Sequence, residues 1–293
     1  MAGLTIGFLG TGIMGAPMAG HLAMAGHRVL AWNRTPQKVE ALPGVERVEA
    51  PAAAAQGADA VVVMLSSGPV CDEILLGPEG ALASMAAGAA LVVMSSIPVE
   101  TARSQAEAAA AQSVLYLDAP VSGGEKGARD ATLSIMAGGS AHAFKRVLPL
   151  LEVMGRPTHV GPVGTGQLAK LVNQMIVAST IATVAEAMLF AERGGADSAK
   201  VREALLGGFA DSTILRQHAL RMINCSFAPG GPAKYQVKDT GTALSYARRL
   251  GLELPVLRLV DALFSDMVAN GDGDLDHSAI IREIGRRNGI KRG

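Results

Sequence analysis

A glycine-rich turn near the N-terminus joins an apolar run to a helical pattern, and it constrains the fold more than any other feature. The run "LTIGFL" (4–9) is followed directly by Gly10-Thr11-Gly12-Ile13-Met14-Gly15. In this spacing the first glycine allows a tight turn, the second lets backbone N–H groups approach a pyrophosphate, and the third lets the helix pack on the strand. The positive end of the helix dipole then faces the phosphates. Because a strand precedes the turn and a helix follows it, we predict that these six residues bind a dinucleotide rather than form a ligand-free turn.

The residues after the second apolar run indicate which dinucleotide. The run "RVLAW" (28–32) is followed by Asn33-Arg34-Thr35. An NAD site usually carries an acidic residue here, which bonds the ribose hydroxyls and would repel a 2′-phosphate. Arg34 can instead pair with a 2′-phosphate, and Asn33 or Thr35 can add hydrogen bonds. Since the acid is missing and the arginine is present, we predict NADP in preference to NAD. The alternative is a solvated arginine in a turn.

Strand and helix patterns divide the chain into two halves. Short apolar runs alternate with Ala-rich helical stretches in the first half, at 4–9, 28–32, 60–65, 90–95, 114–118 and 132–137. Strands that alternate with helices and are apolar on both faces indicate a mainly parallel sheet covered by helices. One long helical pattern then runs from Gln167 to Arg193, and the patterns after it are helical. We predict an α/β Rossmann-type domain with a mainly parallel sheet (1–162), followed by an all-α domain (163–293) joined through a long interdomain helix.

Charge and cysteine content narrow the partners and the compartment. Lys plus Arg number 26 and Asp plus Glu number 26, with no basic run, which argues against nucleic acid or an anionic membrane as the main partner. Cys71 and Cys225 belong to no Cys/His cluster, so we expect reduced thiols and no metal. The N-terminus lacks a basic signal-peptide region, and Lys170, Asn173 and Glu186 interrupt the longest apolar runs. We therefore expect a cytoplasmic protein without a membrane span.

Two further clusters could hold and transform a substrate. The segment Ser122-Gly123-Gly124 offers a hydroxyl and open backbone N–H groups after a strand, which suits a carboxylate, although such a sequence is often only a flexible turn. Lys170 and Asn173 are three residues apart in a helical pattern and therefore share a face. Burying an ammonium group costs free energy unless the side chain extends to solvent, the charge forms an ion pair, or the group has a catalytic role. Reduction of a carbonyl needs a proton donor for the oxygen, and a lysine whose pKa is lowered by burial suits that role.

Four segments occur in order along the chain: "GFLGTGIMGAPMAGHLAMAGH", "DAPVSGG", "GTGQLAKLVNQ" and "KDTGTAL". Together they resemble the β-hydroxyacid dehydrogenase family, which includes 3-hydroxyisobutyrate dehydrogenase, and the resemblance extends over essentially the whole chain. It implies a Rossmann domain, a long interdomain helix, an NADP or NAD cofactor and a small-molecule carboxylate substrate. It also implies a homodimer or homotetramer supported by the all-α domain.

The resemblance implies roles for single residues as well. The segment Ser122-Gly123-Gly124 would hold the substrate carboxylate. Lys170 would be the general acid in reduction and the base in oxidation, with Asn173 positioning the substrate. Lys238 would lie near substrate and nicotinamide, with Asp239 beside it at the cofactor. The other implied cofactor contacts lie at two strand ends: Met64, Leu65, Ser95 and Ser96.

The implied activity is NAD(P)H-dependent reduction of a short semialdehyde acid, with tartronate semialdehyde to glycerate as the first expectation. Alternatives with the same mechanism are 3-hydroxyisobutyrate, threonate and succinic semialdehyde. A non-catalytic nucleotide-binding module is a third possibility, but its mark would be loss of the catalytic lysine, and Lys170 is present. The segment "FAPGGPAKYQVKD" (227–239) departs from a family pattern that is usually more hydrophobic and contains a histidine, so substrate choice is expected to differ there.

An acidic run near the C-terminus partly matches a calcium-binding loop. Asp272, Asp274, Asp276 and Glu283 occupy loop positions 1, 3, 5 and 12. Position 6 is His277, where such a loop needs glycine, and apolar residues fill its second half. We therefore predict no calcium site here; instead Asp276 or Ser278 should cap the last helix.

Overall fold

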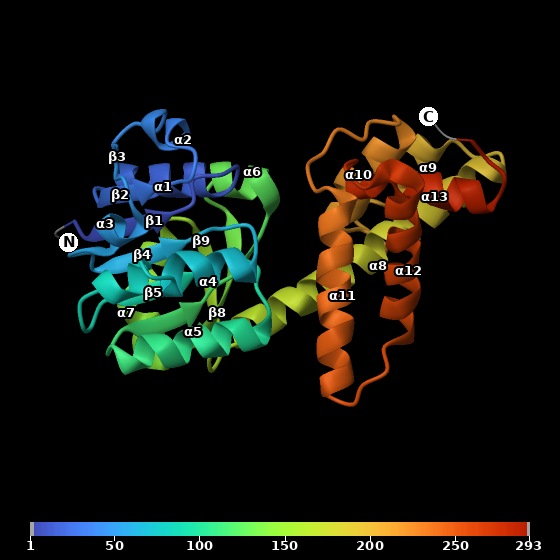
Figure 1. Ribbon diagram of the computed structural model, residues 1–293. Helices are drawn as coiled ribbons and strands as arrows, with labels where there is room; N and C mark the ends of the chain where they lie inside the picture. The colour runs from blue at the N-terminus through green and yellow to red at the C-terminus, as the bar shows by residue number, and fades with distance from the viewer. Residues whose placement is uncertain (1–2, 292–293) are drawn as a thin grey trace. The chain divides into compact units, whose positions relative to one another are not determined.

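The computed structural model describes residues 3–291, which form two compact units divided between Lys170 and Leu171 (Figure 1). The division falls inside one continuous helix, α8 (Thr165–Arg193). The first unit is a sheet covered by helices, and every regular element of the described residues after α8 is helical. The predicted fold class, a mainly parallel Rossmann-type half followed by a helical half, is confirmed. The first compact unit extends beyond the predicted boundary at residue 162 and includes the first turns of α8.

The sheet of the first unit has the strand order β3-β2-β1-β4-β5-β6-β8-β7, with β9 paired to β8. Its strands are β1 (Thr5–Leu9), β2 (Arg28–Trp32), β3 (Val45–Arg47), β4 (Ala60–Val63), β5 (Ala90–Val93), β6 (Leu115–Asp118), β7 (Val121–Ser122), β8 (Leu133–Gly139) and β9 (Gly155–Gly161). The strands from β3 to β6 are parallel and follow the doubly wound order 3-2-1-4-5-6. β8 is antiparallel to β6 and β7, and parallel to β9. The order reverses between β1 and β4, where such folds bind ligands at the carboxyl ends of the strands.

Both faces of the sheet are buried. The side chains of β4 alternate, because Val62 packs in one apolar cluster while Val61 and Val63 pack in the other. The covering helices are α1 (Gly15–Met24), α2 (Gln37–Glu40), α3 (Pro51–Ala55), α4 (Gly68–Leu76), α5 (Val99–Ala111), α6 (Gly124–Arg129) and α7 (Ala141–Glu152). Continuous apolar runs such as "AVVV" in β4 are typical of a strand buried on both sides, which is why the sequence predicts this sheet well.

Three strands carry no such signal, and the sequence did not predict them. β3 has three residues and β7 has two, too few to show a period. In β9 most side chains are exposed, and the strand includes a proline. Their pairing depends on the strands beside them rather than on an apolar pattern of their own.

The helical unit packs around one apolar cluster. Besides α8 it contains α9 (Ser198–Leu205), α10 (Thr213–Ile223), α11 (Ala233–Arg249), α12 (Pro255–Met267) and α13 (Ile280–Arg287). Among the described residues, α8 is the one helix long and apolar enough, by length and composition, to span a membrane. Its side chains at Ala178, Ile181 and Ala185 are nevertheless fully buried in the cluster shared with α10, α12 and α13. Part of the apolar surface of α8 is therefore used in the core of the helical unit, whereas Ile176 and Phe190 on the same helix are exposed.

The acidic run near the C-terminus is engaged in ion pairs and a helix cap. Asp272 pairs with Arg282 and Arg286, and Glu283 pairs with Arg286 and Arg287. The carboxylate of Asp276 accepts the Ser278 amide at 3.0 Å at the start of the short helix that leads into α13. Asp276 therefore caps this short helix (His277–Ala279), whereas the last helix, α13, begins after Ala279 without the predicted side-chain cap. The carboxylates at positions 1 and 12 face guanidinium groups rather than a common centre.

Candidate functional site

The glycine turn after β1 has the geometry of a phosphate-binding loop. Gly10 has φ 102°, and a Cβ there would lie 2.4 Å from the Met64 carbonyl oxygen. A Cβ on Gly15 would lie 1.9 Å from the Gly10 carbonyl oxygen, whereas no described atom lies within 4 Å of a Cβ on Gly12. Close packing therefore requires the first and third glycines, and the second leaves open space at the N-terminus of α1. A nucleotide phosphate fits there, because backbone N–H groups and the helix dipole favour an anion.

Thr11 gives independent support for a ligand at this turn. Its amide donates to the Asn33 side-chain oxygen at 3.1 Å, and the residue is 2% exposed. Its hydroxyl is buried and has no hydrogen-bond partner among the residues described. A buried hydroxyl without a partner costs free energy, so an acceptor such as a phosphate oxygen would stabilise it. Ile13, 72% exposed, and the partly buried Met14 complete the turn.

The end of β2 holds the residues predicted to select the cofactor. The Asn33 amide group also donates to the Thr35 carbonyl at 3.0 Å, so this side chain braces the β2 turn against the phosphate loop. Arg34 is exposed and lines a cavity of about 160 Å³ together with Trp32. Asn33 also lines this cavity, so the side chain that accepts the Thr11 amide of the glycine turn lies beside the predicted 2′-phosphate contact Arg34.

The ends of β4 and β5 hold the next residues predicted to contact the cofactor. Met64 and Leu65 are partly buried, and the Leu65 amide donates to the Ser95 hydroxyl at 2.7 Å. Ser95 is fully buried, so its hydroxyl fixes the β4 end rather than facing a ligand. Ser96 is partly exposed and is the better placed of the two serines for direct cofactor contact.

A buried carboxylate at the end of β6 anchors the start of α8. Asp118 is fully buried and accepts the Gly164 and Gln167 amides at 2.8 Å each. Burial raises the pKa of Asp118 to about 6, and the hydrogen bonds from these amides oppose the rise. The Gln167 side chain then donates to the Ser95 carbonyl at 2.8 Å and accepts the Ile97 amide at 3.1 Å. The first turn of α8 is thus tied to two strand ends, one turn before Lys170.

The segment predicted to bind a carboxylate and Lys170 lie together in the first unit. Gly123 and Gly124 have φ 139° and 60°, a backbone that glycine adopts readily and other residues rarely do. The Lys170 Nζ donates to the Val121 carbonyl at 2.9 Å, one residue before Ser122. The ammonium group therefore lies beside the segment expected to bind a carboxylate. Proton donation to an oxo acid would need the ammonium group within hydrogen-bond reach of the substrate's carbonyl oxygen.

In the helical unit, the remaining predicted residues form a hydrogen-bonded chain. The Asn173 amide donates to the Gln174 side-chain oxygen at 2.8 Å, and Gln174 donates to the Asp239 carboxylate at 2.6 Å. The other Asp239 oxygen pairs with the Lys238 Nζ at 3.0 Å. Asn173 on α8 and Lys238 on α11 are thus linked through Gln174 and Asp239.

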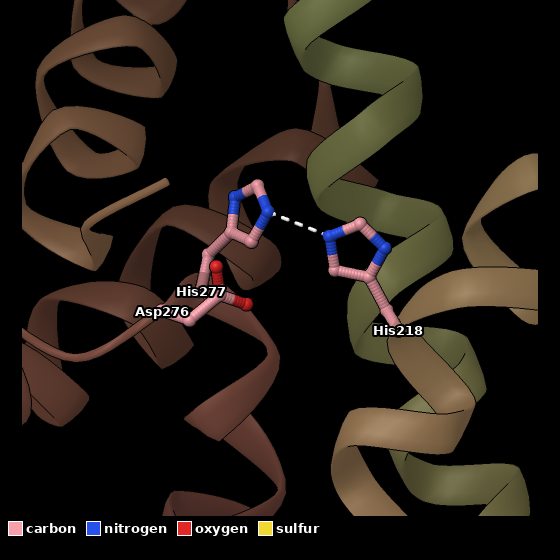
Figure 2. Close-up of side chains that lie close together, drawn as sticks. All are labelled: His218, Asp276 and His277. Carbon is pink, nitrogen blue, oxygen red and sulfur yellow. Dashed lines mark hydrogen bonds between the residues drawn. The ribbon is translucent and has the colours of Figure 1, made fainter. Parts of the chain in front are cut away.

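The loop that leads into α11 is held by a cluster of His218, Asp276 and His277 (Figure 2). The Nε2 atoms of the two histidines face each other at 2.8 Å, and burial lowers the pKa of His218 to about 4 and also lowers that of His277. Asp276 accepts the Gly230 and Gly231 amides at 3.1 and 3.0 Å.

The same Asp276 carboxylate also accepts the Ser278 amide and hydroxyl and pairs with Arg221 at 3.0 Å. A carboxylate offers about four lone-pair sites, and these five donors occupy them. The cluster is therefore suited to fixing the 227–234 loop, and with it the first turn of α11, rather than to metal coordination.

The predicted site residues fall into two groups, one in each unit. The glycine turn, the strand ends, the Ser122 segment and Lys170 belong to the first unit, and Asn173, Lys238 and Asp239 to the second. Asp276 was predicted from the sequence only as a helix cap. Three further positioning residues were not predicted: Asp118, Gln167 and Gln174. The only signal for the first two was a polar residue at the end of an apolar run and another at the start of a helical one.

Comparison with known proteins agrees with this geometry. Residues 5–165 match the NAD binding domain of 6-phosphogluconate dehydrogenase, and residues 164–284 match the family described as NAD-binding of NADP-dependent 3-hydroxyisobutyrate dehydrogenase. The chain is 44% identical to 2-hydroxy-3-oxopropionate reductase of Escherichia coli, over 96% of this chain and 97% of that protein. It is 36% identical to 3-hydroxyisobutyrate dehydrogenase of Pseudomonas aeruginosa, over 94% and 95%. The solved 3-hydroxyisobutyrate dehydrogenase of Mycobacterium tuberculosis with L-serine is 32% identical, with a TM-score of 0.88 and coverage of 96% and 99%.

Replacing Asp118 with Asn should weaken the anchor of α8, because one amide then faces an NH₂ group instead of an oxygen. We expect a loss of about 1–3 kcal/mol in the free energy of unfolding, measured in urea. The pH dependence of the free energy of unfolding should change too. Because burial raises the pKa of Asp118 from 3.8 to about 6, the folded protein binds this proton more tightly than the unfolded chain does, so the wild type should gain stability relative to Asp118→Asn as the pH falls below about 6.

Asp59→Asn is the matched control, since that carboxylate accepts the Thr5 amide at 2.9 Å in an exposed position. It should leave both measurements near wild type. An Asp118→Asn protein with unchanged stability and an unchanged pH profile would show that the carboxylate does not anchor α8.

Proposed function

The chain belongs to the 3-hydroxyisobutyrate dehydrogenase-like family of NAD(P)-dependent oxidoreductases, and on this premise we propose that it reduces tartronate semialdehyde to glycerate with NADPH. The observation that carries the proposal is Lys170, whose ammonium group is held beside the Ser122-Gly123-Gly124 segment. The choice of substrate is supported by the 44% identity to an Escherichia coli 2-hydroxy-3-oxopropionate reductase. The preference for NADPH over NADH is supported by Arg34 at the position where an NAD site usually carries an acid.

The proposed chemistry assigns one task to each group. The Ser122 hydroxyl and the Gly123 and Gly124 amides hold the substrate carboxylate. The bound nicotinamide supplies the hydride that adds to the aldehyde carbon. The Lys170 ammonium donates a proton to the aldehyde oxygen, so that an alcohol forms and a neutral amine remains. In the reverse direction the amine accepts the proton of the alcohol. Asn173 and Lys238 remain predicted substrate contacts, and Asp239 a predicted cofactor contact.

Other short acids are the second candidates for this mechanism. The loop at 229–234 has Gly-Gly-Pro where relatives are expected to be more hydrophobic, and the Lys234 side chain pairs with Asp274 at 2.6 Å. A change in this loop would alter which substrate the enzyme accepts while leaving hydride transfer intact. 3-Hydroxyisobutyrate, threonate and succinic semialdehyde are therefore the comparison substrates. A non-catalytic nucleotide-binding module is the remaining alternative.

Initial rates with a panel of these acids, each measured with the NADP and the NAD form of the cofactor, test the proposed reaction. We expect the highest kcat/KM for tartronate semialdehyde with NADPH. Glycerate with NADP⁺ should give the reverse reaction. If only another acid of the panel is turned over, the proposed substrate is wrong and the proposed mechanism stands. If no acid is turned over in either direction, the non-catalytic alternative is favoured.

Replacing Lys170 with Ala should lower kcat by a factor on the order of 10²–10⁴, the range typical of a lost general acid. Binding of NADP⁺, followed by fluorescence or calorimetry, should persist because the cofactor turn is untouched. Lys170→Arg is the informative control, since it keeps the positive charge but cannot give up a proton. If the arginine variant turned over at the wild-type rate, proton donation by Lys170 would be excluded.

We also propose that the protein is a cytoplasmic homodimer or homotetramer. Several large apolar side chains of the helical unit are exposed, among them Ile176 on α8 and Val256 and Leu259 on α12. Ile176 and Val256 also line one apolar groove. Light scattering after gel filtration should give two or four times the chain mass of 30.0 kDa. A mass of one chain at every concentration would contradict this assembly.

A further inference from the structure

We propose that Arg47 and Glu49 set the balance between NADP and NAD in this protein. Arg47 acts as a second cation for the 2′-phosphate of NADP, and Glu49 competes with that phosphate for the same guanidinium group. The inference rests on the proposed binding of NADP at Arg34 and adds two residues that the sequence patterns did not single out.

The first argument is the position of Arg47 in the sheet. β3 is parallel to β2, and Arg47 is in register with Ala31. The Val48 amide donates to the Ala31 carbonyl at 3.0 Å, which continues the pairing to the ends of both strands. Because parallel strands end at the same edge of a sheet, Arg47 and Arg34 reach one place from two neighbouring strands.

The second argument is the cavity at that edge. Arg34, Arg47 and Glu49 all line the same space of about 160 Å³, with the Trp32 side chain beside them. Two guanidinium groups can share the three oxygens of a phosphate, and each can donate two parallel hydrogen bonds. The two guanidinium groups therefore give the cavity the positive charge that a phosphate dianion needs. The Glu49 carboxylate, which also lines the cavity, opposes its binding.

The third argument is the present pairing of Arg47. One of its Nη atoms lies 2.7 Å from a Glu49 oxygen, and the other lies 3.2 Å from Glu40. The Glu49 side chain is 81% exposed. An exposed ion pair of this kind contributes little free energy, so a phosphate carrying nearly two charges can replace Glu49 as the partner of Arg47.

The consequence is a moderate rather than an absolute preference for NADP. Glu49 repels the 2′-phosphate and can accept hydrogen bonds from the free ribose hydroxyls of NAD. An NAD site usually obtains these two effects from an acidic residue directly after β2, where this chain has none. Arg34 and Arg47 favour the phosphate. Selectivity is therefore decided by an ion pair between two neighbouring side chains rather than by Arg34 alone.

Calorimetric binding of 2′,5′-ADP and of 5′-AMP tests this without any catalytic step. We expect Arg47→Gln to weaken 2′,5′-ADP by about tenfold or more and to leave 5′-AMP within about twofold. Glu49→Gln should tighten 2′,5′-ADP severalfold and leave 5′-AMP unchanged or weaker. Glu46→Gln is the matched control, because Glu46 lies on β3 beside Arg47 but pairs with Arg28.

The outcomes separate this inference from the proposed cofactor. If Arg34→Gln weakens 2′,5′-ADP while Arg47→Gln does not, the NADP site stands and the role of Arg47 is overturned. If Glu46→Gln tightens 2′,5′-ADP as much as Glu49→Gln does, the effect is one of net charge and the role of Glu49 is overturned. If wild-type protein binds 5′-AMP and 2′,5′-ADP equally and Arg34→Gln changes neither, the proposed NADP preference itself fails.

Discussion

The hydrogen bonds from the start of α8 to the buried Asp118 carboxylate are the interaction on which the candidate site depends. Asp118 ends β6 in the interior of the sheet, and its two oxygens accept the amide of Gly164, just before α8, and the amide of Gln167 in the first turn of the helix. A carboxylate at a helix N-terminus is favoured by the unpaired N–H groups and by the helix dipole. The direction and starting point of α8 are thus set by the sheet, and Lys170 follows within one turn of the anchor.

The glycine turn depends on equally close packing at the switch between β1 and β4. The Met64 carbonyl occupies the space that a side chain on Gly10 would need, and the Gly10 carbonyl does the same for Gly15. Asn33 joins this turn to the end of β2. The residues proposed for phosphate binding, cofactor selection and proton donation are therefore positioned by one sheet, through side chains at the ends of neighbouring strands. This accounts for a site assembled from segments far apart in the sequence.

The sequence predicted the features that local pattern determines. The turn from Gly10 to Gly15, the buried strands and the long helix each have a spacing or a continuous apolar run that one segment shows by itself. Asp118, Gln167 and Gln174 could not be found in this way, because their roles come from partners that only the fold brings near. Ser95 shows the same limit: its position at a strand end was predicted, but only the structure shows that its hydroxyl is used by the Leu65 amide. Arg47 needed the register of β3, a strand too short to be seen in the sequence.

A crystal structure with NADP⁺ and glycerate bound tests the central claim most directly. The account predicts the glycerate carboxylate on the Ser122-Gly123-Gly124 segment and the Lys170 Nζ within about 3.2 Å of the hydroxyl that loses its proton. The nicotinamide should approach the carbon that bears this hydroxyl. Glycerate bound with that hydroxyl away from Lys170, in a crystal that holds NADP⁺ on the glycine turn, would contradict the account.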